Sequence, residues 1–185
     1  MTSSIQEVGV WIKRNKLKIN YIKTELITIG SKSKLNQVST NSTVFQDCEI
    51  AFSESVRNLG VFVDESPSLE IQVNQLRKVL DFQLRRISKI RSFQTVDAAD
   101  TLAVAFILSR LDYCNSLLAG LPDHNLAQLQ RIQNNAARLA LRKPRCKSTT
   151  PLLKIFHWLP VKARIEYKVS TLCYPQCLNL SLIHI

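Results

Sequence analysis

Basic side chains recur at helical spacing in two stretches of the chain, a pattern suited to binding phosphate groups. Lys78, Arg85 and Lys89 are seven and four residues apart, so on a helix they lie within a narrow angle of one face. A second row with similar spacing consists of Arg131, Arg138, Arg142 and Arg145. Such rows bind the sugar-phosphate backbone of nucleic acids without reading base sequence. The alternative is a solvated face that holds the charge excess and binds nothing.

Other reactive residue types give weaker candidate sites. Cys173 and Cys177 could bind zinc together with His157 or His184, but this spacing is poor for a closed zinc site. The polar residues of the segment 112–115 could be catalytic, although buried side chains that hold helices together explain them better. The sequence contains no glycine-rich phosphate loop, which argues against a P-loop nucleotide site.

Composition and charge favour a polyanionic partner inside a cell. The 185 residues include 25 Lys/Arg and 14 Asp/Glu, for a formal net charge of +11, and 45% are hydrophobic, as in ordinary folded proteins. That charge favours nucleic acid over an anionic membrane surface. The five cysteines are irregularly spaced, and the sequence shows no signal peptide and no membrane span. We therefore expect an intracellular protein, nuclear or cytoplasmic, that is not secreted and not bound to a membrane.

Hydrophobic periodicity predicts the elements that must position these residues, beginning with an N-terminal helix capped by Ser3 or Ser4. The stretch from Thr24 to Ile29 alternates and is rich in β-branched residues, which predicts a strand followed by a polar loop. Later strands are predicted at Thr43–Gln46, Glu49–Phe52 and Val56–Val63. Gly60 lies inside the last of these and suggests a bulge or a close approach by another backbone. Together they would form a small antiparallel sheet of three or four strands.

After Asp64 the apolar pattern becomes helical, and Ser66 or Ser68 would cap the first helix. The most apolar segment, Leu102 to Pro122, predicts a central helix buried around most of its circumference, with Asp97 as its N-cap. The other predicted helices are Leu69–Ile90, Asp123–Leu141, Pro151–Phe156 and Pro160–Tyr174. The predicted fold class is α+β, with a small antiparallel sheet and an N-terminal helix followed by a predominantly α-helical bundle.

Five stretches of the sequence resemble one protein family. In chain order they are WIKRNKLKINYIKTE, SVRNLGVFVD, SRLDYCNSLLAGLP, LQRIQNNAARLAL and TPLLKIFHWLPVKARIEYK. Together they are similar to the C-terminal part of the reverse transcriptase of non-LTR (LINE-type) retrotransposons, of the jockey-like branch. The resemblance extends from about Glu7 to Tyr174, and the shared order of all five stretches makes it specific although each alone is weak.

The resemblance implies roles for several positions. Lys23 matches the lysine of palm motif D, which lies near the incoming triphosphate and could protonate the pyrophosphate leaving group. The primer grip, which holds the primer end, would consist of Asn58, Leu59, Gly60 and Val61. The helices from Leu69 to Leu141 would form the thumb, which holds the template–primer of RNA and DNA by its backbone. The chain would then divide into a palm remnant (1–66), a helical thumb and following region (67–175) and an unstructured or foreign tail (176–185).

A missing motif bears on activity. Nucleotidyl transfer needs carboxylates that hold two Mg²⁺ ions, and the family places them upstream of motif D, partly on an Asp-Asp pair. No Asp-Asp pair occurs in this sequence. We therefore expect no metal site and no cofactor in this chain, with Mg²⁺ relevant only if the missing palm motifs are supplied.

These observations predict a truncated, non-catalytic remnant of an RNA-directed DNA polymerase, a transposable-element fragment that keeps nucleic-acid binding. It could pair with the missing N-terminal half of the polymerase. Whether to count the chain as an enzyme stays open, since the family is enzymatic and the chain should be inactive alone. An alternative is a structural or interaction module that pairs through the exposed palm edge. A further alternative is a decayed copy without function.

Overall fold

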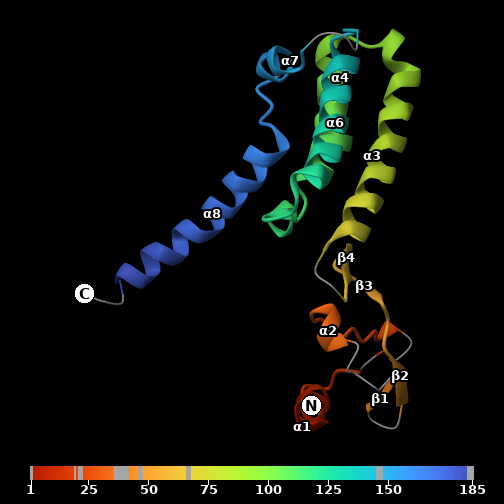
Figure 1. The fold of residues 1–185 in the computed structure, drawn as a ribbon, viewed down its shortest axis with the longest axis vertical. Coiled ribbons are helices and arrows are strands. Elements are labelled where there is room, and N and C mark those ends of the chain that lie inside the picture. The colour runs from red at the N-terminus through yellow and green to blue at the C-terminus, as the bar shows by residue number, and fades with distance from the viewer. Residues whose placement is uncertain are drawn as a thin grey trace. The chain divides into compact units, whose positions relative to one another are not determined.

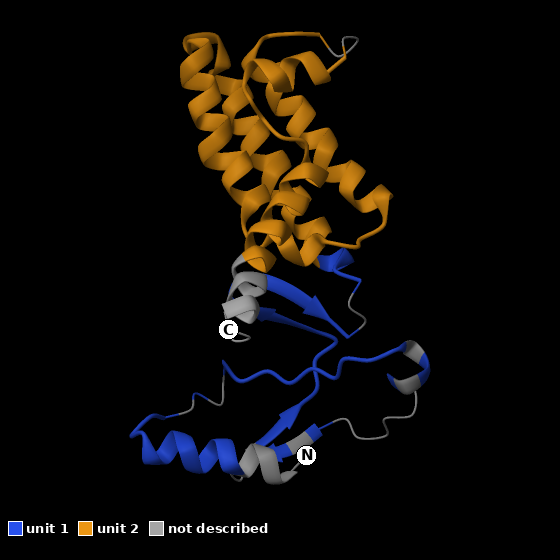
Figure 2. Cartoon of the chain, turned by 90° about the vertical axis from the view of Figure 1, so that its left-hand side faces the viewer, with its two compact units in different colours: residues 1–71 blue, residues 72–185 orange. Residues whose placement is uncertain are grey.

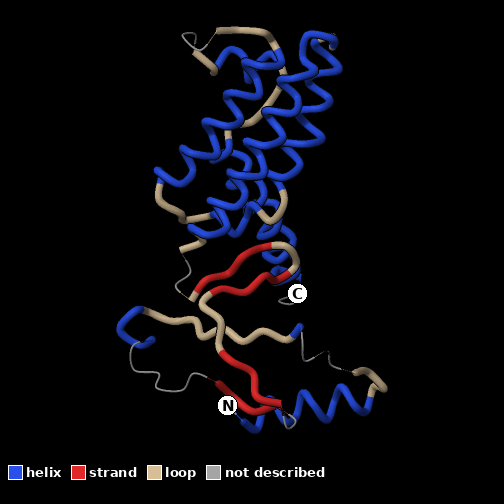
Figure 3. The backbone as a smooth tube through the Cα atoms, turned by 90° about the vertical axis from the view of Figure 1, so that its right-hand side faces the viewer, coloured by secondary structure: helices blue, strands red, loops and turns tan. Residues whose placement is uncertain are grey.

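The computed structural model describes residues 2–18, 20, 23–35, 42–45, 48–65, 68–144 and 148–182. The described residues form helices and short antiparallel strands, which confirms the α+β fold class. The chain divides into two compact units, residues 1–71 (unit 1) and residues 72–185 (unit 2), coloured separately in Figure 2. The named strands all belong to unit 1, and unit 2 is helical (Figure 3).

Unit 1 contains two separate hairpins instead of the single predicted sheet. Its elements are α1 (Thr2–Arg14), α2 (Lys32–Leu35), β1 (Ser42–Phe45), β2 (Cys48–Ala51), β3 (Ser55–Asn58) and β4 (Val61–Asp64), labelled in Figure 1. β1 pairs only with β2, and β3 only with β4, both antiparallel. The N-terminal helix is confirmed, although it begins at Thr2, before the predicted caps. The expected three- or four-stranded sheet is therefore wrong in its pairing.

The strand predicted at Thr24–Ile29 is also wrong. Only Leu26 forms a bridge, with Phe52, supported by a 2.8 Å hydrogen bond from the Ser53 N–H to the Leu26 carbonyl. A second hydrogen bond joins the Gly30 N–H to the Glu65 carbonyl. A strand needs a continuous ladder, and this stretch meets different partners at isolated points, so its alternation of residue types does not produce one.

The strand predicted at Val56–Val63 is instead the hairpin of β3 and β4. Asn58 pairs with Val61, and the two residues between them have positive φ, 47° at Leu59 and 85° at Gly60. A two-residue turn with positive φ at both positions matches the twist of a hairpin, and glycine suits its second position. Gly60 is therefore a turn residue and not a bulge.

Unit 1 has a small apolar core. Among its described residues, the buried apolar side chains are Ile50 and Val61. The apolar residues of α1 at Val8, Val10 and Trp11 are each more than half exposed. The helical periodicity of α1 is thus real, and the described part of the chain half-buries Ile12 but leaves Val8 and Trp11 largely exposed.

Unit 2 is built around α6. Its elements are α3 (Glu70–Ile90, whose first two residues belong to unit 1), η2 (Arg91–Phe93), α4 (Val96–Ala103), η3 (Val104–Leu108), α5 (Ser109–Asp112), η4 (Asn115–Leu118), α6 (Asp123–Ala140), α7 (Thr150–Ile155) and α8 (Val161–Leu182). α6 contacts α4, α7 and α8. The core residues Leu80, Ile107 and Leu129 are fully buried. None of the helices formed by described residues is long and apolar enough to cross a membrane.

The central helix differs from its prediction. It runs without a break from α4 through the π-helical turn η3 to α5, and it ends at Asp112, well before Gly120. Its N-cap is Thr95, whose hydroxyl accepts a 3.2 Å hydrogen bond from the Ala98 N–H, so the prediction of Asp97 is wrong. Phe106 is exposed on η3. The helix therefore buries one face and not most of its circumference.

The other helices of unit 2 begin close to their predicted positions, and α3, α6 and α7 also end close to theirs, whereas the end of α8 was predicted wrongly. Ser68 accepts from the Glu70 N–H (3.3 Å) and donates to the Asp64 carboxylate (2.6 Å), which confirms one of the two predicted caps of α3. Ser66, the other predicted cap, lies outside the described residues. α8 continues through Pro175 to Leu182, so the expectation of an unstructured tail is wrong for residues 176–182. Proline removes one helical hydrogen bond but does not force the helix to stop.

Candidate nucleic-acid interface

A groove of about 400 Å³ in unit 2 lies between the second half of α3 and the end of α6. Its lining residues include five cations: Arg85, Arg91, Arg138, Arg142 and Lys143. Ser88 and Asn135 add a hydroxyl and an amide, and none of the described lining residues is acidic. Because guanidinium and ammonium groups donate charge-assisted hydrogen bonds, this surface is suited to an anion with several acceptor oxygens.

Some members of each predicted basic row line this groove. Arg85 of the first row and Arg138 and Arg142 of the second are among its lining residues. Three other predicted residues are exposed but do not line the groove: Lys78, Lys89 and Arg131. Arg145 lies outside the described residues. The surface that the rows share is therefore more compact than two full helix faces.

Arg91, which the sequence patterns did not single out, is the most buried cation of the groove at 5% exposure. Its Nε donates to the Leu139 carbonyl (3.0 Å), its Nη2 to the Ala140 carbonyl and its Nη1 to the Gln94 carbonyl (2.7 Å). The last carbonyls of a helix lack partners within the helix, so Arg91 satisfies two of them on α6. Burial and then the charge of Arg142 lower the pKa of Arg91, which stays protonated because an arginine ordinarily titrates far above neutrality.

Arg142 occupies the left-handed position that ends α6. Its φ is 52°, its N–H donates to the Leu139 carbonyl (3.2 Å), and the Lys143 N–H donates to the Arg138 carbonyl (2.9 Å). This is the Schellman arrangement of helix ends, in which glycine usually takes the left-handed position. An arginine there costs conformational energy, and such strain is frequent at functional positions.

The side chain of Arg142 returns to the segment after α3. Its Nη2 donates to the carbonyls of Arg91 (3.0 Å) and Ser92 (3.1 Å). Arg91 binds the end of α6 while Arg142 binds the start of η2, so the two arginines connect both walls of the groove. The groove is therefore held in shape by two of its own cations.

The positions that the resemblance links to catalysis lie in unit 1. Lys23 is exposed, in a short turn where its N–H donates to the Asn20 carbonyl (3.0 Å). Leu59 and Gly60 form the tip of the β3–β4 hairpin, with Asn58 and Val61 as its last pair. Leu59 is 84% exposed, whereas Val61 is buried. The predicted roles of these residues remain predictions.

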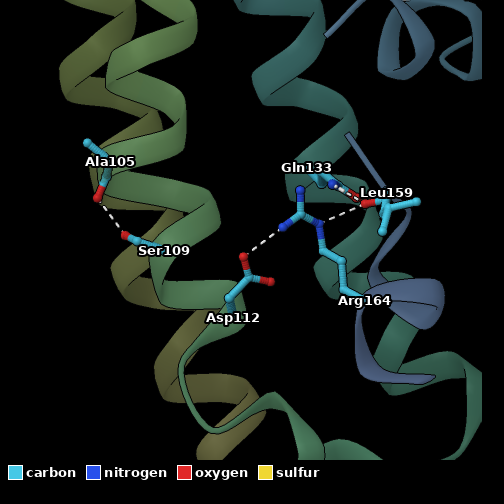
Figure 4. A network of polar contacts seen from close by, with 6 residues as sticks. All are labelled: Ala105, Ser109, Asp112, Gln133, Leu159 and Arg164. Carbon is cyan, nitrogen blue, oxygen red and sulfur yellow. Dashed lines mark hydrogen bonds and ion pairs between the residues drawn. The ribbon is translucent and has the colours of Figure 1, made fainter. Parts of the chain in front are cut away.

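Asp112, one of the polar residues of segment 112–115, belongs to a packing network in unit 2 (Figure 4). Asp112 on α5 accepts a 2.7 Å ion-pair hydrogen bond from Nη1 of Arg164 on α8, and Nε of Arg164 donates to the Leu159 carbonyl (2.8 Å). The fully buried Gln133 on α6 donates to the same carbonyl (2.8 Å). This supports the interpretation of Asp112 as a residue that holds helices together. Tyr113, in contrast, is 56% exposed.

The weaker metal candidates find no cluster. Within the described ranges, no three His, Cys, Asp or Glu side chains come together as a metal site requires. His157 and Cys173 are exposed, and His184 lies outside the described residues.

Comparison with known proteins gives no match to this chain. No family model, no curated protein and no solved structure matches it. The residues and the geometry of the chain itself must therefore support any functional proposal.

Proposed function

We propose that the chain is a C-terminal fragment of a non-LTR retrotransposon reverse transcriptase that binds nucleic acid and is not catalytic alone. The five stretches that resemble the LINE-type, jockey-like enzymes support the family, and the groove between α3 and α6 supports the binding. The ligand would be an RNA/DNA template–primer, held by its backbone inside the cell. The missing N-terminal half of the polymerase would be a second partner.

The groove is the single observation on which the binding proposal depends most. Arg85 reaches it from α3, and Arg138 and Arg142 reach it from the end of α6. Three cations from two helices, with no acidic neighbour among the described lining residues, favour a polyanion over a neutral ligand. Contacts from cations to phosphate oxygens carry no base-sequence information, so we expect binding without sequence preference.

The hairpin tip is the proposed primer grip. Leu59 is a large apolar residue at positive φ, and it is 84% exposed at a position that asparagine or glycine would occupy with less strain. Strain retained at an exposed position is more common at functional sites than elsewhere. Lys23 would act near a triphosphate only if the missing half of the polymerase supplied the rest of that site.

The proposal includes no pair of Mg²⁺ ions. The sequence has no Asp-Asp pair, and the described residues form no cluster of three metal-ligating side chains. The proposed activity is therefore nucleic-acid binding alone.

Fluorescence anisotropy with labelled RNA–DNA duplexes of two unrelated sequences tests the proposal. Both duplexes should bind equally, and three phosphate contacts would weaken binding roughly 40-fold between about 50 and 200 mM salt. Arg85→Gln should reduce affinity, while Arg86→Gln is the matched control because Arg86 is the next residue and does not line the groove. Absence of binding at low salt, or an equal loss in both variants, would overturn the proposal.

The small core of unit 1 favours a second candidate, an interaction module. The described part of unit 1 buries only Ile50 and Val61 as apolar core, and isolated two-stranded hairpins are marginally stable. A partner chain that covered the apolar side of α1 and the hairpin edges would stabilise the unit. Sedimentation of the purified chain without nucleic acid distinguishes the candidates, since the module predicts concentration-dependent oligomers and simple backbone binding predicts a monomer.

A further inference from the structure

The groove is too compact for a long stretch of nucleic-acid backbone. Its five cations surround about 400 Å³, and Lys78, Lys89 and Arg131 do not extend its lining. A phosphodiester inside a strand has one negative charge, and successive phosphates need successive cations along a track. A terminal phosphate monoester concentrates a charge of about −1.5 to −2 on three acceptor oxygens. Dense positive charge around one small volume suits the second kind of group better.

The lining also offers neutral donors beside the cations. The hydroxyl of Ser88 on α3 and the amide of Asn135 on α6 border the groove together with Arg85 and Arg138. A monoester has three terminal oxygens, and it can accept hydrogen bonds from both helices at the same time. An internal phosphodiester has two free oxygens and would leave more of these donors without a partner.

Arg91 and Arg142, the two arginines held by main-chain carbonyls, also favour an anion with two negative charges. Arg91 and Arg142 are held by main-chain carbonyls and not by carboxylates, so their charges are not neutralised by the groups that position them. Their mutual repulsion contributes to the lowered pKa of Arg91. An anion with two negative charges in the groove would offset this repulsion more than a singly charged one.

From this geometry we infer that the groove between α3 and α6 binds the terminal phosphate monoester of a nucleic-acid strand end in preference to the phosphodiesters within the strand. This inference rests on the proposed nucleic-acid binding and specifies the part of the ligand that enters the groove. Arg85, Arg138 and Arg142 contact the phosphate, and Arg91 acts as a positioning residue beneath the end of α6.

The test compares two DNA oligonucleotides of one sequence, labelled at the 3′ end, with either a 5′-phosphate or a 5′-hydroxyl. Anisotropy at low salt should give at least about fivefold tighter binding of the phosphorylated strand, because one unit of its added charge of about −1.5 to −2, near one cation in water, already gives this factor. Arg85→Gln and Arg142→Gly should abolish this preference, and Arg86→Gln should retain it. Inorganic pyrophosphate should displace the phosphorylated strand more readily than the hydroxyl strand.

The outcomes separate the inference from the proposal beneath it. Equal binding of both strands overturns the inference and leaves backbone binding intact, whereas no binding of either strand overturns both. A preference that survives in both groove variants places the phosphate elsewhere and overturns the inference. Should Arg142→Gly fail to fold by circular dichroism, Arg85→Gln decides alone, because Arg85 is exposed and its loss removes no core contact.

Discussion

Arg91 donates hydrogen bonds to main-chain carbonyls close to Arg142 in the sequence, and Arg142 donates hydrogen bonds to main-chain carbonyls at Arg91 and the residue after it. Arg91 binds the carbonyls of Leu139 and Ala140, and Arg142 binds those of Arg91 itself and Ser92. The two side chains join the end of α3 to the end of α6 without any carboxylate. The stability of unit 2 and the proposed anion binding would therefore depend on the same pair of residues.

Arg91→Met should destabilise unit 2 strongly. The substitution keeps a long side chain but removes the donors to three main-chain carbonyls, two of them at the end of α6, and we expect a loss of about 2–4 kcal/mol in the free energy of unfolding. Urea denaturation followed by circular dichroism measures it. Arg77→Met, on the exposed side of α3, should change stability by less than about 0.5 kcal/mol. Similar effects of the two variants would show that Arg91 does not hold the helix end.

The Asp112–Arg164 ion pair should contribute about 1 kcal/mol of coupling energy, because its side chains are 45% and 15% exposed and water screens the charges in part. A double-mutant cycle with Asp112→Asn and Arg164→Met isolates this coupling from the hydrogen bond of Arg164 to Leu159. The coupling should decrease in high salt. A coupling energy near zero would mean that the network is held by Gln133 and Arg164 through Leu159 alone.

Leu59→Asn should stabilise the β3–β4 hairpin by about 1 kcal/mol, since asparagine followed by glycine suits a turn with two positive φ values. The leucine side chain is 84% exposed, so little packing is lost. Slower amide hydrogen exchange in β3 and β4 would report the gain. Under the primer-grip proposal the same variant should bind a primer end less well, and unchanged binding would argue against that role.

Asp100→Asn should make the stability of unit 2 less sensitive to rising pH. Burial raises the pKa of Asp100, and the nearby indole N–H of Trp158 lowers it by a smaller amount. No hydrogen bond of normal geometry joins the two side chains. Because the folded state binds this proton more tightly than the unfolded state, the carboxyl favours folding at acidic pH, and this contribution is lost as pH rises through the raised value. Melting temperatures between about pH 4 and 7 should fall less in the variant than in the original chain. Parallel curves for the two proteins would contradict the assignment.

The salt dependence of binding should distinguish phosphate contacts in the groove from contacts with the cations of the basic rows that do not line it. The double variant Arg85→Gln/Arg142→Gly should lower the slope of log K against log salt by about 0.9 for each lost phosphate contact. Lys78→Gln/Lys89→Gln removes the same number of cations from exposed positions that do not line the groove, and it should lower the slope less. Equal reductions would favour a row of contacts along α3 over a localised site.

The long helices were predictable because their apolar residues recur at helical spacing. Leu80 belongs to the repeat that predicts α3, and Leu129 to that of α6; both are fully buried. The hairpin at Leu59 was not predictable, since Leu-Gly is an unusual turn pair and the apolar alternation continues across it. The early end of the central helix depends on the left-handed conformation of Cys114, a residue type that gives no such signal.

The candidate site was predictable only where spacing determines it. Arg85 and Arg138 come together because each belongs to a basic row at helical spacing and because α3 and α6 border one groove. Arg142 lies two residues beyond the end of α6, so helical spacing alone does not place it. Arg91 lies outside this spacing, and its role depends on reaching another helix end, which no local pattern encodes. A basic residue just after a predicted helix is the one signal that could have indicated it.

The π-helical turn at Val104–Leu108 has a consequence for how this chain can change. The Ser109 N–H bonds to the Val104 carbonyl, five residues back, so the turn contains one residue more than an α-helix needs. Deletion of the exposed Ala105 would restore ordinary helical bonding and would still direct Ile107 and Leu111 toward the same neighbours. We therefore expect that deletion of one residue in this turn would destabilise the protein less than deletion of one residue elsewhere in its helices.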